Sequence, residues 1–264
     1  MNFNRLSGFI LLLVIQIMLA CGTDDPAICI PVNLKSTTDS IVFEFNTSKK
    51  IDKVLYYFFE LHQIDELEYD NSGRLVWVKR KKVSNGTENV YENGELIYNS
   101  EGKPQTLNAW GANTGLPPQV TTFSYDSKER LIKRETSFGS DLIVYRYEYD
   151  NHDNVINIFY TNAGNPEVLG RENLSFDSHA RFFAPILDLE ILSVFVYNTE
   201  PSKNNILSST VYWDGPFTKF GAPLNITYDV RYNENGLIVN SFSITGTGQT
   251  VQEFSFHGIN YDCQ

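Results

Sequence analysis

The sequence predicts an all-β fold, an antiparallel meander of hairpins in a strongly curved or half-barrel sheet. Three observations support this prediction. A turn signal recurs along the chain, and the segments between its copies alternate apolar and polar residues. Aromatic residues, which favour pleated strands, are abundant, with 18 Phe, 15 Tyr and 3 Trp. A turn that recurs between alternating segments is typical of stacked hairpins.

The turn signal is an aromatic residue, then Asp or Asn, a polar stretch and an apolar residue. Asp or Asn starts a turn by bonding the backbone two residues on. Three places later, Gly73 takes a positive φ without steric cost, which predicts a type I turn with a bulge. Asp153 tolerates this geometry, whereas Glu129 and Ala180 fit it less well, so we expect different or weaker turns there. The copies are Tyr69–Leu75, Tyr125–Leu131, Tyr149–Val155, Phe176–Phe182 and Tyr232–Ile238.

The spacing of the copies predicts further, degenerate copies. Their Asp or Asn residues lie at 70, 126, 150, 177 and 233, at intervals of 56, 24, 27 and 56 residues. Since each long interval is about two short ones, we expect a hidden copy, and Tyr91–Leu96 fits the first gap. The second gap contains an apolar segment that fits one short helix near 184–196, with Pro185 in its first turn. Asn108–Pro118 is rich in Gly, Asn and Pro and predicts a surface loop.

A family resemblance rests on the intact run Tyr69-Asp70-Asn71-Ser72-Gly73-Arg74-Leu75. This run resembles the YD-repeat element of Rhs-type proteins, and similar runs occur in lipoproteins of Bacteroidetes. The resemblance extends loosely over residues 60–262. In the large members such repeats form a coiling antiparallel sheet that encloses a cargo. This chain is too short to close such a shell, so the resemblance implies the hairpin meander and no catalytic residues.

The first 20 residues have the layout of a secretory signal peptide, with Arg5 before an apolar run at 9–19. The run is shorter than the ~20 residues that a membrane-spanning helix needs. Met18-Leu19-Ala20-Cys21 resembles the box of bacterial lipoproteins, in which the Cys is acylated and becomes the mature N-terminus. Met18 and Leu19 depart from the usual Leu and small residue, so an ordinary secreted protein cut nearby is the alternative.

The residues behind Cys21 predict where the protein is anchored. Asp24-Asp25 resembles the surface-export signal of Bacteroidetes-type lipoproteins, and a solvated acidic linker is the alternative. We therefore expect a protein anchored to the outer membrane by an N-terminal lipid and exposed at the cell surface. The expected organisation is a signal peptide at 1–20, a flexible lipidated linker at 21–38 and a single β-sheet domain at 39–264.

Two further cysteines, Cys29 and Cys263, lie near opposite ends of the mature chain. Exported compartments permit disulfides, so the sequence predicts a bridge between them. Two free, buried thiols are the alternative.

The net charge and the sequence motifs disfavour several classes of partner and site. A net charge of −11 disfavours nucleic acid as a partner. The one basic run, Lys79-Arg80-Lys81-Lys82, falls on an expected strand, where it protects an edge or solvates a face. No His has a second metal ligand at helical or hairpin spacing, and Asp150–Asn154 lacks the ligand pattern of a calcium loop. We therefore expect no metal, no cofactor and no catalytic residues. The four His are His62, His152, His179 and His257.

Trp77, Trp110 and Trp213 are candidates for stacking on a ligand. Trp110, in the expected loop, is the best of them, and an anchor tucked onto the core is the alternative. The sequence thus predicts a non-catalytic surface lipoprotein, a module that binds a glycan or protein or assists envelope assembly. A carbohydrate-active hydrolase on the same anchor and a lipid-holding, chaperone-like sheet are the alternatives.

Overall fold

The computed structural model describes residues 29–35, 39–58, 60–112, 115, 117–162, 165–180, 191, 201–214, 218–234, 238–245 and 258–263. These residues form 16 strands, and helix is limited to Ile191. The strands are β1 (Cys29–Lys35), β2 (Asp39–Phe45), β3 (Ile51–Phe58), β4 (Glu60–Tyr69), β5 (Leu75–Ser84), β6 (Thr87–Tyr98), β7 (Pro104–Gly111), β8 (Gln119–Tyr125), β9 (Leu131–Phe138), β10 (Asp141–Tyr149), β11 (Val155–Asn162), β12 (Val168–Ala180), β13 (Asn204–Asp214), β14 (Thr218–Tyr232), β15 (Ile238–Thr245) and β16 (Gly258–Cys263).

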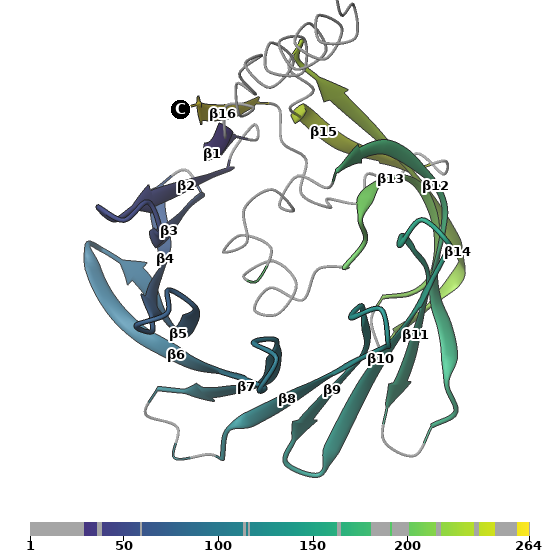
Figure 1. Cartoon of the computed structure of the whole chain (residues 1–264), viewed down its shortest axis with the longest axis horizontal. Coiled ribbons are helices and arrows are strands. Elements are labelled where there is room, and N and C mark those ends of the chain that lie inside the picture. Colours follow the sequence, from purple (N-terminus) through teal and green to yellow (C-terminus); the bar gives the residue numbers. More distant parts are fainter. Residues whose placement is uncertain are drawn as a thin grey trace, which may run out of the picture. The chain divides into compact units, whose positions relative to one another are not determined.

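The strands form one open sheet in which β1 to β15 follow sequence order and β16 lies next to β1 (Figure 1). Each neighbouring pair from β1–β2 to β14–β15 is antiparallel. The predicted all-β antiparallel meander is therefore confirmed. Residues 31–260 belong to one compact unit, the main unit, and residues 29–30 and 261–263 belong to another.

Within the described residues, none of the helical structure is long and apolar enough to cross a membrane.

Five hairpins of the main unit close with one turn geometry, all at the same end of the strands, which we name the turn end. The Asn or Asp at the first position accepts hydrogen bonds from the backbone N–H groups two and four places on. Asp126 Oδ1, for example, accepts from the N–H groups of Lys128 and Arg130, each at 2.9 Å. The residue at the fourth position has a positive φ, and a bulge precedes the turn. The turns span 46–50, 70–74, 99–103, 126–130 and 150–154.

The tyrosine before a turn ties that turn to the preceding one. Its hydroxyl donates to the carbonyl of the residue that follows the preceding turn, and the last side chain of that turn, a Lys or Arg, lies over its ring. Tyr149, for example, donates to Leu131 O at 2.6 Å, and Arg130 lies 4.6 Å from its ring centroid. The accepting residues are buried. The tyrosine hydrogen bonds therefore join successive turns into a row over the core, which we name the ladder. The other pairs are Tyr69 with Ile51, Tyr98 with Leu75 and Tyr125 with Pro104.

The sixth turn, led by Asp177, keeps the hydrogen bonds of the ladder, but different residues donate them. Phe176 has no hydroxyl, and Asn173 Nδ2 donates to the Val155 carbonyl in its place, at 2.8 Å. Asp177 Oδ1 accepts from His179 N and from Asn205 N, at 3.0 and 3.2 Å. Asn205 therefore does what the fifth residue does in the other turns. The chain between Ala180 and Asn204, which pair across β12 and β13, is an insertion into a repeat turn.

Two predictions about the repeat are wrong. The Tyr91–Leu96 segment lies inside β6, where Gly94 is buried beside Leu107; the hidden copy is the turn led by Asn99 instead. Glu129, expected to fit the turn poorly, has φ 70° in a turn of the standard hydrogen bonding. The hydrogen bonds to Asp126 outweigh the ~1–2 kcal/mol that a left-handed residue costs. An earlier copy, led by Asn46, precedes all five that the sequence reveals.

The structure differs from two further expectations in where an element begins or ends, and it describes only one residue of a third. The sheet begins at Cys29, inside the segment 21–38 expected as linker, because Leu34 is buried against the β2 partner Ile41. The strand β7 runs to Gly111, so Asn108 to Gly111 are not loop. Of the helix expected near 184–196, the structure describes Ile191 alone, which is helical and buried; the rest lies outside the described residues.

Candidate functional site

Two of the three candidate tryptophans meet on one face of the main unit. Trp77 on β5 and Trp110 on β7 pack edge to face, with ring centroids 5.1 Å apart and planes at 73°. Both are half-buried, so each ring supports the other and keeps part of its surface accessible. Trp110 thus lies on a strand and is fixed by a second indole, which suits a stacking platform better than a mobile loop does.

Polar side chains surround the two indoles. The strand register places Glu95 on β6 opposite both Trp77 and Asn108, and Asn93 opposite Trp110. Because cross-strand partners point to the same face, all five side chains share one surface. Asn108 Nδ2 donates to Glu95 Oε2 at 3.3 Å, so the amide and the carboxylate are positioned together. We name Trp77, Asn93, Glu95, Asn108 and Trp110 the tryptophan patch.

The opposite face of the same strands carries a charged network. Asp65 on β4 is fully buried and accepts from Gln63 Nε2 at 2.9 Å and from the Tyr56 hydroxyl at 3.4 Å. Its Oδ2 lies 3.7 Å from Arg80 Nε, and Arg80 Nη1 is ion-paired with Glu92 Oε1. We name the face toward which Arg80 points the arginine face.

The arginine face continues as a polar surface beyond this network. Arg134 is 3% exposed and lies over the Tyr145 ring, 4.1 Å from its centroid. Thr121 and Thr136 share a hydrogen bond of 3.0 Å on the neighbouring strands β8 and β9. Buried polar groups of this kind require partners, and the sheet supplies them from adjacent strands.

The basic run Lys79–Lys82 lies in β5, between β4 and β6, so it protects no sheet edge. Lys81 Nζ pairs with Glu66 Oε1 at 2.5 Å and with Glu88 Oε2 at 3.0 Å, and Glu66 is the larger cause of the raised pKa of Lys81. Together with the Arg80–Glu92 pair, these contacts neutralise much of the run within the sheet itself.

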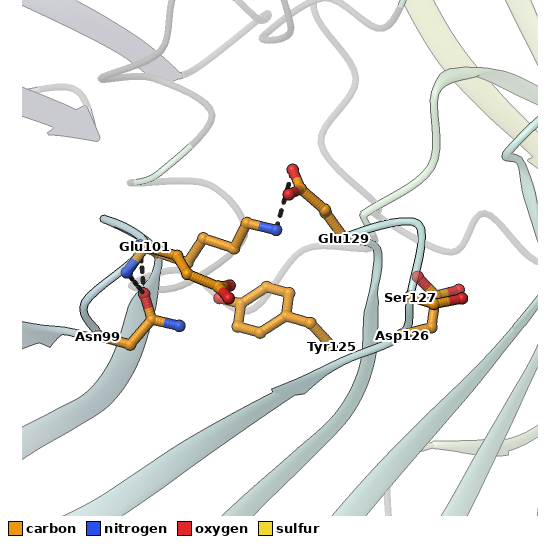
Figure 2. Close-up of a pocket in the computed structure, with 7 residues that line it drawn as sticks. Asn99, Glu101, Tyr125, Asp126, Ser127 and Glu129 are labelled. Atoms are coloured by element: carbon orange, nitrogen blue, oxygen red, sulfur yellow. Dashed lines mark hydrogen bonds and ion pairs between the residues drawn. The ribbon is translucent and has the colours of Figure 1, made fainter.

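A cavity of about 500 Å³ lies at the turn end, between the turns led by Asn99 and Asp126 (Figure 2). Several of its polar groups are engaged in the turns that line it. Asn99 Oδ1 accepts from two backbone N–H groups of its own turn, and Lys103 Nζ pairs with Glu129 Oε2 at 3.0 Å. Turn formation accounts for these side chains, so we assign no ligand to this cavity.

Five carboxyl groups among the described residues have clearly lowered pKa values. The backbone N–H of Arg74, followed by its guanidinium, lowers the pKa of Asp70. Burial opposes the lowering at Asp126 and Asp150, but hydrogen bonds from their own turns outweigh it. Arg146 lowers the pKa of Glu148 and Glu167 by hydrogen bonding to both. These five groups are stabilised as anions, which suits acceptors in the structure and not a general acid at neutral pH.

The remaining predicted site residues are placed only in part. Cys29 begins β1 and Cys263 ends β16, and these strands are neighbours in the sheet order. Both cysteine side chains lie outside the described residues, so the disulfide stays a prediction. Trp213 lies on β13, and its side chain is likewise outside the described residues. Cys21, the predicted lipidation site, lies outside them as well.

The histidines in repeat turns have different environments. His152 is exposed, with Nδ1 3.9 Å from Asp150 Oδ2. His179 stacks on Tyr232 with ring centroids 3.9 Å apart, a contact that the sequence did not reveal. In the part of the chain that the structure describes, no group of three or more His, Cys, Asp or Glu side chains is arranged to hold a metal ion.

Comparison with solved structures identifies the fold class first. A porin-like protein from Bacteroides uniformis aligns over 90% of this chain and 97% of its own, with a TM-score of 0.52 and 13% identity. At this identity the likeness shows a shared fold alone. Chains of the Photorhabdus luminescens Tc holotoxin pore and of TcdB2-TccC3-TEV align over 80% and 81% of this chain, with TM-scores of 0.34 and 0.35 and identities of 19% and 18%.

The toxin alignments span only 9% and 10% of those chains, and at these TM-scores they carry no argument. No protein-family model matches the sequence. No curated protein matches it significantly either. The likeness to YD-repeat proteins therefore rests on the turn motif.

Proposed function

We propose that this protein is a non-catalytic lipoprotein of the outer membrane, exposed at the cell surface, and that it binds glycans through the tryptophan patch. The observation that carries the proposal is the pairing of Trp77 on β5 with Trp110 on β7 across the intervening strand β6, on one face of the sheet. A half-exposed indole offers a flat apolar surface to the C–H face of a sugar, and Asn93, Glu95 and Asn108 provide donors and acceptors for its hydroxyl groups.

The location rests on the N-terminal sequence. The Met18–Cys21 box supports acylation of Cys21, and Asp24-Asp25 supports export to the surface. Acylation with two or more chains gives stable anchoring, because each buried methylene contributes about 0.8 kcal/mol. The porin-like protein of Bacteroides with the same fold is in keeping with an envelope location.

The two alternative functions receive less support from the described residues. A lipid-holding sheet needs a large, continuous apolar face, whereas Asp65, Arg80, Glu92 and Arg134 interrupt the buried apolar residues of the arginine face. A glycoside hydrolase needs one carboxyl group with a raised pKa, and the shifted carboxyl groups described above are all lowered.

A glycan array probed with the full-length protein in detergent tests the proposal. We expect bound glycans, and a more than tenfold weaker affinity in Trp110→Ala and in Trp77→Ala, since each loses one half of the platform. Leu174→Ala on β12 is the matched control, because Leu174 is a large apolar side chain 56% exposed. A wild-type array without signal, or tryptophan variants that bind as the wild type does, would refute the tryptophan patch as a glycan site.

A further inference from the structure

The main unit covers many of its aromatic rings with its own cations. Among the described residues, a Lys or Arg side chain lies over eight Tyr or Phe rings, between 4.0 and 5.8 Å from the ring centroid. The negative face of an aromatic ring attracts a cation, and of the aromatic side chains Trp attracts it most strongly. The pairs are Lys50 with Tyr69, Arg74 with Tyr98, Lys82 with Tyr91, Lys103 with Tyr125, Arg130 with Tyr149, Arg134 with Tyr145, Arg146 with Phe159 and Arg171 with Tyr228.

The two indoles of the tryptophan patch differ from these rings. In the part of the chain that the structure describes, no Lys or Arg side chain lies over Trp77 or Trp110. They contact each other across β6 and remain half-exposed. The patch therefore offers the ring type that attracts a cation most strongly, with none of the described cations of the protein over it.

Carboxylates stand on both sides of Trp77. The register places Glu68 on β4 opposite Trp77 on one side, and Glu95 on β6 opposite it on the other side. Cross-strand partners share a face and have Cβ atoms about 5 Å apart, so both carboxylates can reach a group bound at the indole. Glu68 is exposed, and Asn108 holds the Glu95 carboxylate at the patch. A cation at Trp77 would thus meet one aromatic and two anionic partners.

A lysine on the same face does not cancel this attraction. Lys79 lies two residues along β5 from Trp77, about 7 Å away, opposite Glu66 on β4. Glu66 in turn accepts from Lys81 Nζ at 2.5 Å, so these residues form a charged group beside the patch. Two carboxylates at about 5 Å outweigh one ammonium at about 7 Å, because the Coulomb energy falls with distance. The charges around Trp77 therefore favour a cation over an anion.

We propose that the tryptophan patch selects glycans with a free amino group, so that its ligands are cationic amino sugars. This inference rests on the function proposed for the patch, because it takes the ligand to be a glycan. The sugar ammonium lies over Trp77 and between the carboxylates of Glu68 and Glu95. Asn93 and Asn108 bind hydroxyl groups of the same sugar. An N-acetylated sugar lacks the charge, and a uronic acid carries the opposite one.

Isothermal titration calorimetry on the full-length protein in detergent tests the inference at about pH 6, where an amino group is protonated and Glu is ionised. The probes are the β-1,4-linked hexamers of D-glucosamine and of N-acetyl-D-glucosamine, which share one backbone. We expect the glucosamine hexamer to bind about tenfold more tightly. Glu68→Gln and Glu95→Gln should each reduce this preference about threefold, since each removes one anionic partner at an accessible site. Glu101→Gln is the matched control, because it removes the same charge from an exposed position in the turn led by Asn99 and should leave the preference unchanged.

The outcomes separate this inference from the function on which it rests. Equal affinities for the two hexamers, or tighter binding of the N-acetylated one, would overturn the amino-sugar preference, and loss of that binding in Trp77→Ala would leave the glycan site standing. Equal losses of preference in all three Gln variants would assign it to the net charge of the protein and would overturn it too. So would tighter binding of tetralysine than of the glucosamine hexamer, which would make a protein side chain the ligand. Absence of binding by both hexamers would overturn the inference, whereas only a glycan array without signal would also refute the glycan site.

Discussion

The connections at the two ends of the strands in the main unit differ in how regular they are. At the turn end, five hairpins repeat one geometry, and tyrosines join successive turns. At the other end the connections vary in length. β5 and β6 are joined by Asn85-Gly86, with φ of 51° and 73°, whereas Gly111 and Gln119 are joined by a longer connection. Repetition is therefore confined to one end.

This difference shows where the repeat is constrained. A turn that contacts both its neighbours must match them in geometry, because its fifth residue and its preceding tyrosine each contact an adjacent turn. A connection without such neighbours is free to change length. The insertion between Ala180 and Asn204 supports this interpretation, since it enters a turn of the ladder only where Asp177 and Asn205 preserve the hydrogen bonds.

The largest effect on the free energy of unfolding is expected from a substitution that removes the hydrogen bonds of one turn of the ladder. Asp126 accepts from two backbone N–H groups at 2.9 Å and from Arg130 Nε and Nη2 at 2.8 and 2.7 Å. We expect Asp126→Ala to lower the free energy of unfolding by about 2 kcal/mol, measured by urea denaturation. Asp141→Ala, an exposed carboxylate at the other end, is the matched control and should change it by less than about 0.5 kcal/mol. Equal effects of the two substitutions would contradict the comparison.

Asp126→Asn separates the contribution of the Asp126 charge from that of its hydrogen bonds. Asn leads the turns at 46 and 99, so the amide keeps the acceptor and loses only the charge. The folded-state pKa of Asp126 lies below its ordinary value, so the stabilisation by its charge is present above that ordinary value and is lost as pH falls through the folded pKa. The stability difference between wild type and Asp126→Asn should therefore shrink between about pH 5 and pH 2. A difference that stays constant over this range would assign the effect to packing.

A smaller effect is expected from the tyrosine contacts. Tyr149→Phe removes the hydrogen bond to Leu131 O and should lower the free energy of unfolding by about 1 kcal/mol. Phe176→Tyr is the reciprocal test, because the Val155 carbonyl already accepts from Asn173. The added hydroxyl should give no gain in urea denaturation. A clear gain from Phe176→Tyr would mean that Asn173 does not replace the tyrosine hydroxyl.

The fold could be predicted from the sequence largely because the turn chemistry is local. Asp70, Asp126 and Asp150 bond backbone groups within four residues, so their turns are visible in a short window. The turn led by Asn99 escaped because Pro104 replaces the apolar residue at the end of the motif. Lys49 and Glu129 are tolerated at positive φ because Asn46 and Asp126 accept hydrogen bonds from backbone N–H groups within the same turn.

The candidate sites were less predictable because they depend on register. The sequence identified Trp77 and Trp110 as candidates, but their contact requires β5, β6 and β7 to align as they do. The Arg80–Glu92 pair adjoins a bulge between Arg80 and Lys81, which shifts the alignment of β5 with β6 by one residue. A one-residue shift moves side chains to the other face, so no composition or spacing rule could place this pair.

The smallest predicted effect concerns the left-handed position of the turn. Glu129 has φ 70° and Gly73 has φ 76° at the same position of two turns. Glu129→Gly should raise the free energy of unfolding by about 0.5 kcal/mol, since the relief of backbone strain exceeds the entropy that Gly loses. The Lys103–Glu129 pair adds little against this gain, because the Glu129 side chain is 72% exposed. Gly73→Ala should lower the free energy of unfolding by about 1 kcal/mol, and opposite signs in urea denaturation for the two substitutions would show that the ladder imposes one backbone geometry on both turns.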